Sequence, residues 1–222
     1  MIEIKVTDAF RDVCPDFLGA VIEADVENSP TSSELWEEIN RYIAQLRTEY
    51  TTDSIKQRAG IAATRKAYKK AGKDPSRYRP ACEQLARRVL QGKDLYSVDT
   101  LVDLVNLASL FSGYSTAALD RDKIEGDTLT LGLGEAGEPY EGIGRGVLNI
   151  EHLPVYRDEV GGVATPTSDN VRTMMSPETH HLVVLINGYD GDRKMLEDTI
   201  ALTQELLRRF ANSDGGSYKF YE

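Results

Sequence analysis

Residues 98–112 form the stretch that most constrains the fold of this 222-residue chain. The sequence VDTLVDLVNLASLFS places apolar side chains around nearly the whole circumference of a helix, so we expect that helix to be buried on most sides. Its polar residues follow spacings of four, three and three, which put them on one narrow stripe: Asp99, Asp103, Asn106 and Ser109. Because stripping water from a carboxylate is costly without partners, this stripe either lines a cleft or ties down the backbone of adjacent loops.

Helix signals precede this stretch, and strand signals follow it. A helix is expected to begin at Ser32 or Ser33, and a basic, alanine-rich helix over 55–71 ends where Gly72 can adopt a left-handed conformation. After Gly113, glycine and β-branched residues become more frequent. We expect further helices at 81–91 and 192–210, strands at 2–6, 18–26, 128–133, 147–150, 153–156, 171–174 and 182–186, and a frayed tail after residue 210.

This order of elements predicts an α+β fold. A helical N-terminal half is expected to pack on a mixed or antiparallel sheet, and a C-terminal helix closes the chain as one domain over 1–222. The first ten residues carry charges that a secretory leader lacks, and the longest aliphatic run, 182–186, is too short to span a bilayer. Cys14 and Cys82 give neither a disulfide framework nor a metal-ligand spacing. We therefore expect a cytoplasmic protein with reduced thiols and with no metal, cofactor or membrane partner.

Charge is distributed unevenly along the chain, whose formal net charge is -10. Residues 56–94 contain twelve lysines and arginines against three acids, a net charge of +9, whereas the remainder of the chain carries -19. Screening confines each charge to about 8–10 Å at physiological salt, so one face can attract a polyanion although the whole protein is acidic. The alternative is a set of solvated helix faces.

The segment between the predicted strands near 153 and 182 collects polar side chains. Asp158, Thr167, Asp169 and Arg172 offer carboxylates, a hydroxyl and a guanidinium within a short, glycine-containing stretch. Such a mixture can bind an amino-acid-like group, with Asp pairing its amine and Arg its carboxylate or ester. The alternative is a loop whose side chains satisfy its own turns. The glycine motif at 132–137 is not followed by a helix, which argues against a dinucleotide site.

Several ordered motifs in the middle of the chain resemble the B3/B4 domain of the phenylalanyl-tRNA synthetase β subunit, and especially free-standing proteins built from that domain. The resemblance covers about residues 55–187. The stretch YSVDTLVDLVNLAS is similar to the family pattern NNVVDxTNYV and keeps Val102, Asp103 and Asn106. The stretch TAALDRDKIEG is similar to the pattern LHAFDxDKIxG, and LGLGEAGE and PVYRDEVGGVATP follow in the family order.

The resemblance implies an α+β domain that, in the bacterial synthetase, hydrolyses tyrosine wrongly attached to phenylalanine tRNA. A positioned water attacks the aminoacyl ester, with no covalent nucleophile. Two positions depart from the family pattern, because Ala117 stands where the family has histidine and Val105 stands where it has threonine. Asn106 remains a candidate pocket residue, and Asp169 could supply a carboxylate in place of the missing group.

Three functions follow as hypotheses. The first is a protein that binds tRNA or the 3′ end of aminoacyl-tRNA and hydrolyses mischarged aminoacyl esters, without aminoacylation activity. The second is a binding protein for a small amino-acid-like molecule with no RNA role, and the third is a non-catalytic interaction module. The first hypothesis assigns catalysis to Asn106 and Asp169, substrate binding to Asp103, Asp158, Thr167 and Arg172, and phosphate contacts to Arg58, Arg65, Lys66, Lys69, Lys70, Lys73, Arg77 and Arg79.

Overall fold

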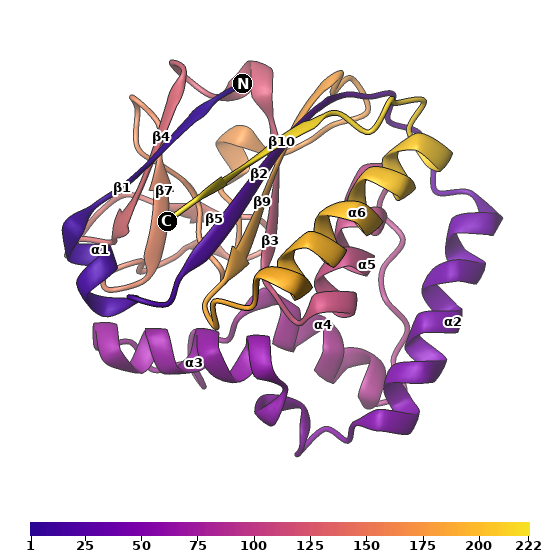
Figure 1. The fold of residues 1–222 in the computed structure, drawn as a ribbon, viewed down its shortest axis with the longest axis horizontal. Helices are drawn as coiled ribbons and strands as arrows, with labels where there is room; N and C mark the ends of the chain where they lie inside the picture. The colour runs from indigo at the N-terminus through magenta and orange to yellow at the C-terminus, as the bar shows by residue number, and fades with distance from the viewer.

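Two four-stranded sheets organise the computed structural model, which describes all 222 residues (Figure 1). The first sheet has the order β1-β4-β7-β8, and only its β1–β4 pair is parallel. The second has the order β10-β2-β9-β3 and is antiparallel throughout. The strands are β1 Glu3–Val6, β2 Leu18–Asp25, β3 Thr116–Asp120, β4 Thr128–Leu133, β5 Glu141–Gly142, β6 Gly146–Val147, β7 Pro154–Arg157, β8 Gly162–Ala164, β9 His181–Gly188 and β10 Ser217–Tyr221.

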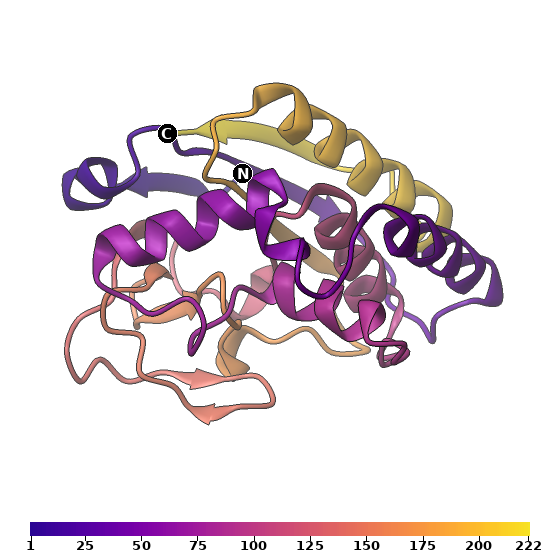
Figure 2. The same ribbon diagram turned by 90° about the horizontal axis from the view of Figure 1, so that it is seen from below.

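Six helices surround the two sheets, and most of them lie on the side of the second sheet or along the lower edge of both sheets (Figures 1 and 2). None of them is long and apolar enough to cross a membrane. The small β5–β6 hairpin projects away from the layers and is the part of the chain nearest the bottom edge of Figure 2. The helices are α1 Asp8–Val13, α2 Ser33–Glu49, α3 Ala59–Ala71, α4 Ala81–Leu90, α5 Thr100–Ser112 and α6 Arg193–Phe210, with short 3-10 turns η1 Ile55–Gln57, η2 Arg121–Lys123 and η3 Val171–Thr173.

The central strand β9 is apolar on both faces. Leu182, Val184 and Ile186 belong to the hydrophobic cluster that α5 and α6 complete, whereas Val183 and Leu185 belong to the cluster shared with the first sheet. Successive side chains of a strand point to opposite faces. The continuous aliphatic run in the sequence therefore marks a strand that is covered on both sides.

Helix α5 is buried as the sequence predicts, with ten of its thirteen residues buried. Asp99 caps its N-terminus by accepting a hydrogen bond from the Val102 N–H at 2.9 Å. Gly113 ends it with a φ of 75°, a left-handed conformation that glycine adopts without a steric penalty. The helix packs against α6, α4 and β3, so it is the central helix of its layer.

Most predicted elements are confirmed, and four expectations are wrong. The helix expected over 55–71 is interrupted at Arg58, whose ψ of 132° separates the 3-10 turn η1 from α3. The strand at 128–133 and the helix end at Gly72 are found as predicted. Instead of the strand expected at 171–174, Val171–Thr173 form the 3-10 turn η3. Of the strand expected at 147–150, only Val147 pairs, as part of β6 Gly146–Val147. The tail does not fray, because β10 pairs with β2 and the Tyr221 hydroxyl hydrogen-bonds the buried Tyr156 hydroxyl at 2.7 Å.

Leu104→Ala tests the central position of α5. Leu104 is fully buried in the larger hydrophobic cluster, so its truncation should lower the free energy of unfolding by about 3 kcal/mol through lost burial and an unfilled cavity. Val98→Ala, at a site 59% exposed just before the helix, is the matched control and should change stability by less than about 0.5 kcal/mol. Equal effects in urea denaturation would contradict this placement.

Candidate functional site

Several lysine and arginine side chains of the basic segment, residues 56–94, form contacts with other groups of the protein. The Arg58 guanidinium donates to the backbone carbonyls of Leu110, at 2.5 Å, and Phe111, and it also contacts the Tyr42 hydroxyl at 3.2 Å. Carbonyl groups in the last turn of a helix have no partners within the helix, and Arg58 satisfies two of them in α5. The side chain of Arg58 is therefore engaged at the end of α5.

A second group of cations surrounds one buried carboxylate. Glu83 is fully buried in α4, and it pairs with Arg65 and Arg87 at 2.8 Å each and lies 3.7 Å from Arg79. Lys73 is also buried, with its ammonium 3.8 Å from the centroid of the Tyr78 ring. Much of the positive charge of the segment thus holds α3, α4 and their connecting loop together.

The remaining cations form an exposed surface on α3. Lys66, Lys69 and Lys70 are exposed, and neither Lys66 nor Lys69 has a partner within the protein. Arg77 is exposed in the loop before α4 and stacks only against Tyr78. A hollow of about 440 Å³ lies on this surface and contains no acidic residue: its lining is Lys56, Ala62, Arg65, Lys66 and Lys69.

The loop that carries Asp169 lies against the segment joining α3 to α4. The Tyr68 hydroxyl of α3 hydrogen-bonds the Thr167 hydroxyl at 2.9 Å, and the N–H of Ala81 donates to the Pro166 carbonyl at 2.8 Å. Thr167 also donates to the Tyr78 carbonyl at 3.1 Å. Thr167 is thus buried and engaged, and the basic segment and the loop after β8 are neighbours.

Asp169 is held beside the outer edge of β3. Its carboxylate accepts one hydrogen bond, from the backbone N–H of Ala118 at 3.2 Å. Burial raises the pKa of Asp169 to about 7, and the single bond from Ala118 offsets that effect only in part. The residue nevertheless keeps partial solvent exposure. That exposure belongs to the residue as a whole, because the carboxyl group itself is buried. A carboxyl group with this pKa can exchange a proton near neutral pH with a water molecule that reaches it.

Asn106 lies on the polar stripe of α5, on the side of the helix that faces β3. One turn further along, the Ser109 hydroxyl hydrogen-bonds the Thr116 hydroxyl of β3, which also donates to the Val105 carbonyl at 3.2 Å. Asn106 is partly exposed, and its amide has no hydrogen-bond partner within the protein. Asn106 and Asp169 thus belong to two different elements, helix α5 and the loop after β8, that both contact β3.

Asp103 connects segments at the start of α5. Its carboxylate accepts hydrogen bonds from the Thr31 hydroxyl at 2.5 Å, the Val98 N–H at 3.3 Å and the Ser97 hydroxyl at 3.4 Å. Burial raises the pKa of Asp103, and these bonds act in the opposite direction. These contacts fit the second of the two roles expected for the polar stripe of α5, which is to tie down adjacent loops. A contact between Asp103 and a substrate stays a prediction.

Asp158 and Arg172 bind each other. The guanidinium donates to both carboxylate oxygens, at 2.9 and 2.7 Å, and Asp158 also accepts from the N–H groups of Glu125, Val160 and Gly161. Burial by itself raises the pKa of Asp158, but the bonds from Arg172 and the three N–H groups outweigh it, so the pKa lies below its usual value. A substrate amine or carboxylate would have to compete with this pair.

The two positions that depart from the family pattern are both buried. Ala117 lies in the hydrophobic cluster between the sheets, and Val105 lies in the cluster formed with the helices. Each is 4% exposed. Neither position therefore places a polar group at the edge of β3 where Asp169 and Asn106 approach.

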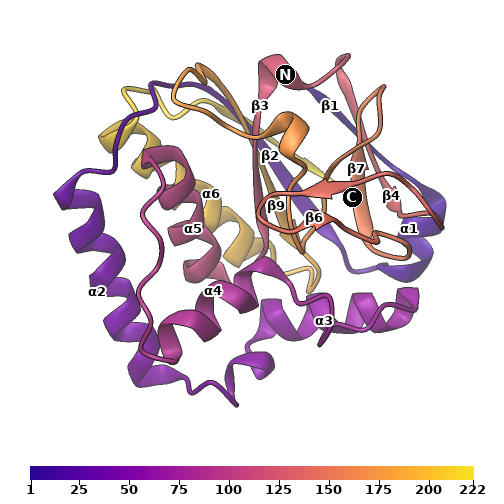
Figure 3. The same cartoon turned by 180° about the vertical axis from the view of Figure 1, so that it is seen from behind.

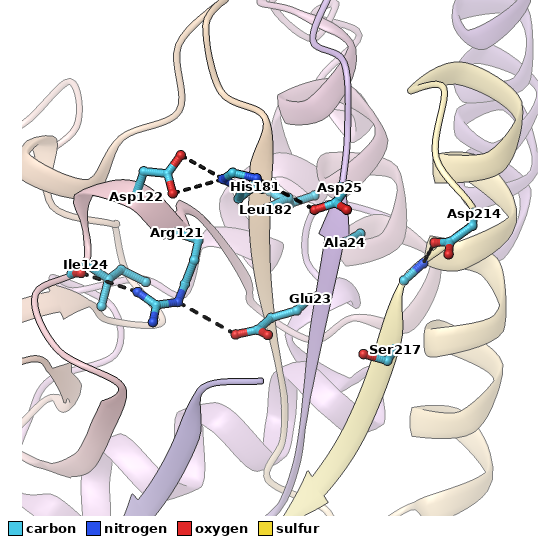
Figure 4. Close-up of a pocket in the computed structure, with 11 residues that line it drawn as sticks. Glu23, Ala24, Asp25, Arg121, Asp122, Ile124, His181, Leu182, Asp214 and Ser217 are labelled. Carbon is cyan, nitrogen blue, oxygen red and sulfur yellow. Dashed lines mark hydrogen bonds and ion pairs between the residues drawn. The ribbon is translucent and has the colours of Figure 1, made fainter.

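A separate, polar hollow of about 740 Å³ lies at the other end of the second sheet (Figure 4). His181 lies there between Asp122, 2.8 Å from its Nδ1, and Asp25, 3.8 Å from its Nε2. The hydrogen bond to Asp122, together with the charges of both carboxylates, raises the pKa of His181. The residues that line this hollow come from β2, η2, β9 and the start of β10. Because these elements are far apart in the sequence, no local spacing of residues could have revealed the hollow.

The chain belongs to the B3/4 domain family, whose model matches residues 63–212. Among solved structures, it is similar to an N-terminal fragment of the phenylalanyl-tRNA synthetase beta-subunit from Pyrococcus horikoshii, with 10% sequence identity and a TM-score of 0.46. That similarity covers 98% of this chain and 50% of the fragment, so the chain spans half the length of that structure. None of the curated proteins matches this sequence.

Asp158→Asn tests the internal ion pair. The change should lower the free energy of unfolding by about 2–4 kcal/mol near neutral pH, because it leaves Arg172 without its carboxylate partner. The lowered pKa of Asp158 means that its contribution is present above the unfolded-state pKa of about 3.9 and is lost as pH falls through the folded-state pKa.

Urea unfolding at a series of pH values measures this dependence, and the wild-type and variant stabilities should converge in acid. Asp127→Asn, which removes a highly exposed carboxylate paired with Arg121, is the control and should cost less than about 1 kcal/mol. A destabilisation by Asp158→Asn that persists unchanged in acid would rule out the ion pair as its cause.

Proposed function

We propose that this protein binds tRNA or the 3′ end of aminoacyl-tRNA through the exposed lysines of α3, and that it hydrolyses the aminoacyl ester without charging tRNA. The observation that carries the proposal is the acid-free basic hollow on a protein whose net charge is -10. Lysines that are unpaired in the protein can release the counterions of a phosphate backbone, which is the main source of nucleic-acid affinity. Membership of the B3/4 domain family supports the same class of partner.

The proposed chemistry takes place at the edge of β3. Asp169, with a pKa of about 7, accepts a proton from a water molecule, and the resulting hydroxide attacks the ester carbonyl carbon. The ester C–O bond breaks, and the protonated Asp169 returns its proton to the terminal ribose oxygen, which leaves as a hydroxyl group while the amino acid is released. The amide of Asn106 orients the water or the carbonyl, since it has no partner within the protein. Thr167 and the Asp158–Arg172 pair position the loop that carries Asp169.

A second candidate is a protein that binds a free amino-acid-like molecule and has no RNA role. The overall charge of -10 and the absence of a polar side chain at Ala117 favour it, because both weaken the case for an RNA-editing centre. Thermal stabilisation by amino acids without any mobility shift of tRNA would select this candidate. An intact fold that binds neither would leave the interaction module.

The double variant Lys66→Glu, Lys69→Glu tests the nucleic-acid surface. It should abolish tRNA binding at moderate salt, and Lys66→Gln, Lys69→Gln should make the plot of log affinity against log salt shallower by about 1.5, because two phosphate contacts are lost. Arg58 and Arg65 are poor choices for this test, since their loss would also disturb α5 and Glu83.

The control variant Lys194→Glu, Lys219→Glu places the same charge change on exposed residues elsewhere and should retain binding. Unchanged affinity of the Lys66/Lys69 variants at low salt would remove the RNA proposal.

Asp169→Asn and Asn106→Ala test the hydrolytic centre on a panel of mischarged tRNAs. Wild-type deacylation should rise with pH through about 7 and then level off, because the base must be deprotonated. Asp169→Asn should remove this pH dependence and lower the rate by about 100-fold or more, the range expected for loss of a general base. Asp198→Asn on α6 is the chemically matched control. Deacylation by Asp169→Asn with an unaltered rate and pH profile would exclude Asp169 as the base.

A further inference from the structure

Tyr96, in the loop between α4 and α5, is the most exposed aromatic residue of the protein. It is 71% exposed, whereas the next aromatic residue in this order, Tyr218, is 45% exposed. A single exposed apolar residue needs no explanation, but Val98, two residues later in the same loop, is 59% exposed as well. The loop therefore presents a small apolar surface to solvent.

The residues on both sides of Tyr96 are anchored. Leu95 is buried in the larger hydrophobic cluster. The Ser97 hydroxyl accepts a hydrogen bond from the indole N–H of Trp36 at 3.1 Å and donates one to the Asp103 carboxylate at 3.4 Å. Because its two neighbours are held in this way, the exposure of Tyr96 is set by the fold.

The guanidinium of Arg88 lies over the ring of Tyr96, 3.9 Å from the ring centroid. Its Nε donates to the Asp94 carbonyl at 2.6 Å, which holds the Arg88 side chain in this position. The two terminal nitrogens of Arg88 have no acceptor within the protein. One face of the ring is thus covered by a cation, and the high exposure of Tyr96 leaves the opposite face open to solvent.

The surroundings of this ring are basic. We call the side chains of Arg88, Lys93 and Tyr96 the Tyr96 surface. Lys93 is exposed and has no partner within the protein. The exposed carboxylate of Asp94 opposes the two cations, and a formal charge of +1 remains for these four residues. An open aromatic face beside cations is the combination with which proteins bind single-stranded nucleic acids.

The Tyr96 surface and the basic hollow on α3 are connected through α4. Arg65 lines the hollow and binds Glu83 at 2.8 Å, and Glu83 binds Arg87, the residue before Arg88, also at 2.8 Å. The ten residues of α4 span about 15 Å. A ligand that contacts both the hollow and the Tyr96 surface must therefore be an extended polyanion.

We propose that Tyr96 stacks against an unpaired base of a bound RNA, and that Arg88 and Lys93 contact the phosphates next to that base. This proposal rests on the RNA-binding function proposed above and adds that the recognised part of the RNA is single-stranded. Every base has a flat face, so the stacking requires no particular sequence. Bases within a duplex are already stacked on one another, so only unpaired nucleotides can reach the ring.

The test compares binding of the whole protein to a single-stranded oligoribonucleotide and to an RNA duplex of the same length, at several salt concentrations. Tyr96→Ala should weaken single-strand binding by about 10-fold or more, because the base loses its aromatic partner, and should leave duplex binding unchanged. The plot of log affinity against log salt should keep its slope, since no cation is removed. Tyr96→Phe, which keeps the ring, should bind as the wild type does, and so should the control Tyr218→Ala.

Trp36 reports whether RNA reaches this loop. It is the only tryptophan of the chain, and its indole hydrogen-bonds Ser97, the residue after Tyr96. Single-stranded RNA should therefore change the tryptophan fluorescence of the wild type and of Tyr96→Phe. The variant Lys66→Gln, Lys69→Gln should need more RNA to reach the same final change.

Three results would overturn the proposal, and they separate it from the RNA function. Unaltered single-strand affinity of Tyr96→Ala, in a protein whose binding still depends on Lys66 and Lys69, would remove the stacking contact and keep RNA binding. Equal losses of single-strand and duplex affinity in Tyr96→Ala would show that the ring does not select unpaired bases. A wild-type protein that binds neither RNA would remove both proposals.

Discussion

Burial of β9 on both faces is the constraint on which the rest of the structure depends. A strand with apolar side chains on both faces requires one layer on each side, and here α5 and α6 supply one while the first sheet supplies the other. With β3 paired to β9 along one side only, the N–H of Ala118 points away from the sheet and needs an acceptor. Asp169 provides it, so the position of this carboxylate follows from completing the sheet edge. The edge strand β3 is labelled in the view from behind in Figure 3.

The chemistry of arginine and lysine explains how an acidic protein can keep a basic surface. Arginine presents a planar group with several donors, and here Arg58 binds two helix carbonyls and Arg65 binds Glu83, as suits a residue that fixes several groups at once. Lysine is strongly hydrated and carries its charge on a flexible stem, and Lys66 and Lys69 extend into solvent. The segment thus divides its charge into an internal part that stabilises the fold and an exposed part that remains available.

The sequence predicts elements whose pattern is local and misses those that depend on distant partners. The alternation of apolar and polar residues is sufficient to predict the strand Thr128–Leu133, and Gly72 marks the end of α3. By contrast, β10 forms only because β2 offers an open edge, and Thr116–Asp120 is too short to stand out. The sequence places Asp158 and Arg172 in one loop, but it cannot show that they bind each other.

The two departures from the family pattern restrict where hydrolysis could occur. Ala117 points into the core between the sheets, so the strand itself contributes no imidazole at its outer edge. Any reactive group of the proposed hydrolytic centre must instead reach β3 from outside, on α5 or on the loop after β8. Asp169 meets this requirement, and its pKa of about 7 has a simple origin: burial removes water from the carboxylate, and one N–H at 3.2 Å replaces little of it. Because the carboxylate of Asp169 is incompletely solvated, its hydrogen bond with the Ala118 N–H stabilises it only weakly. The same incomplete solvation makes Asp169 a suitable proton acceptor.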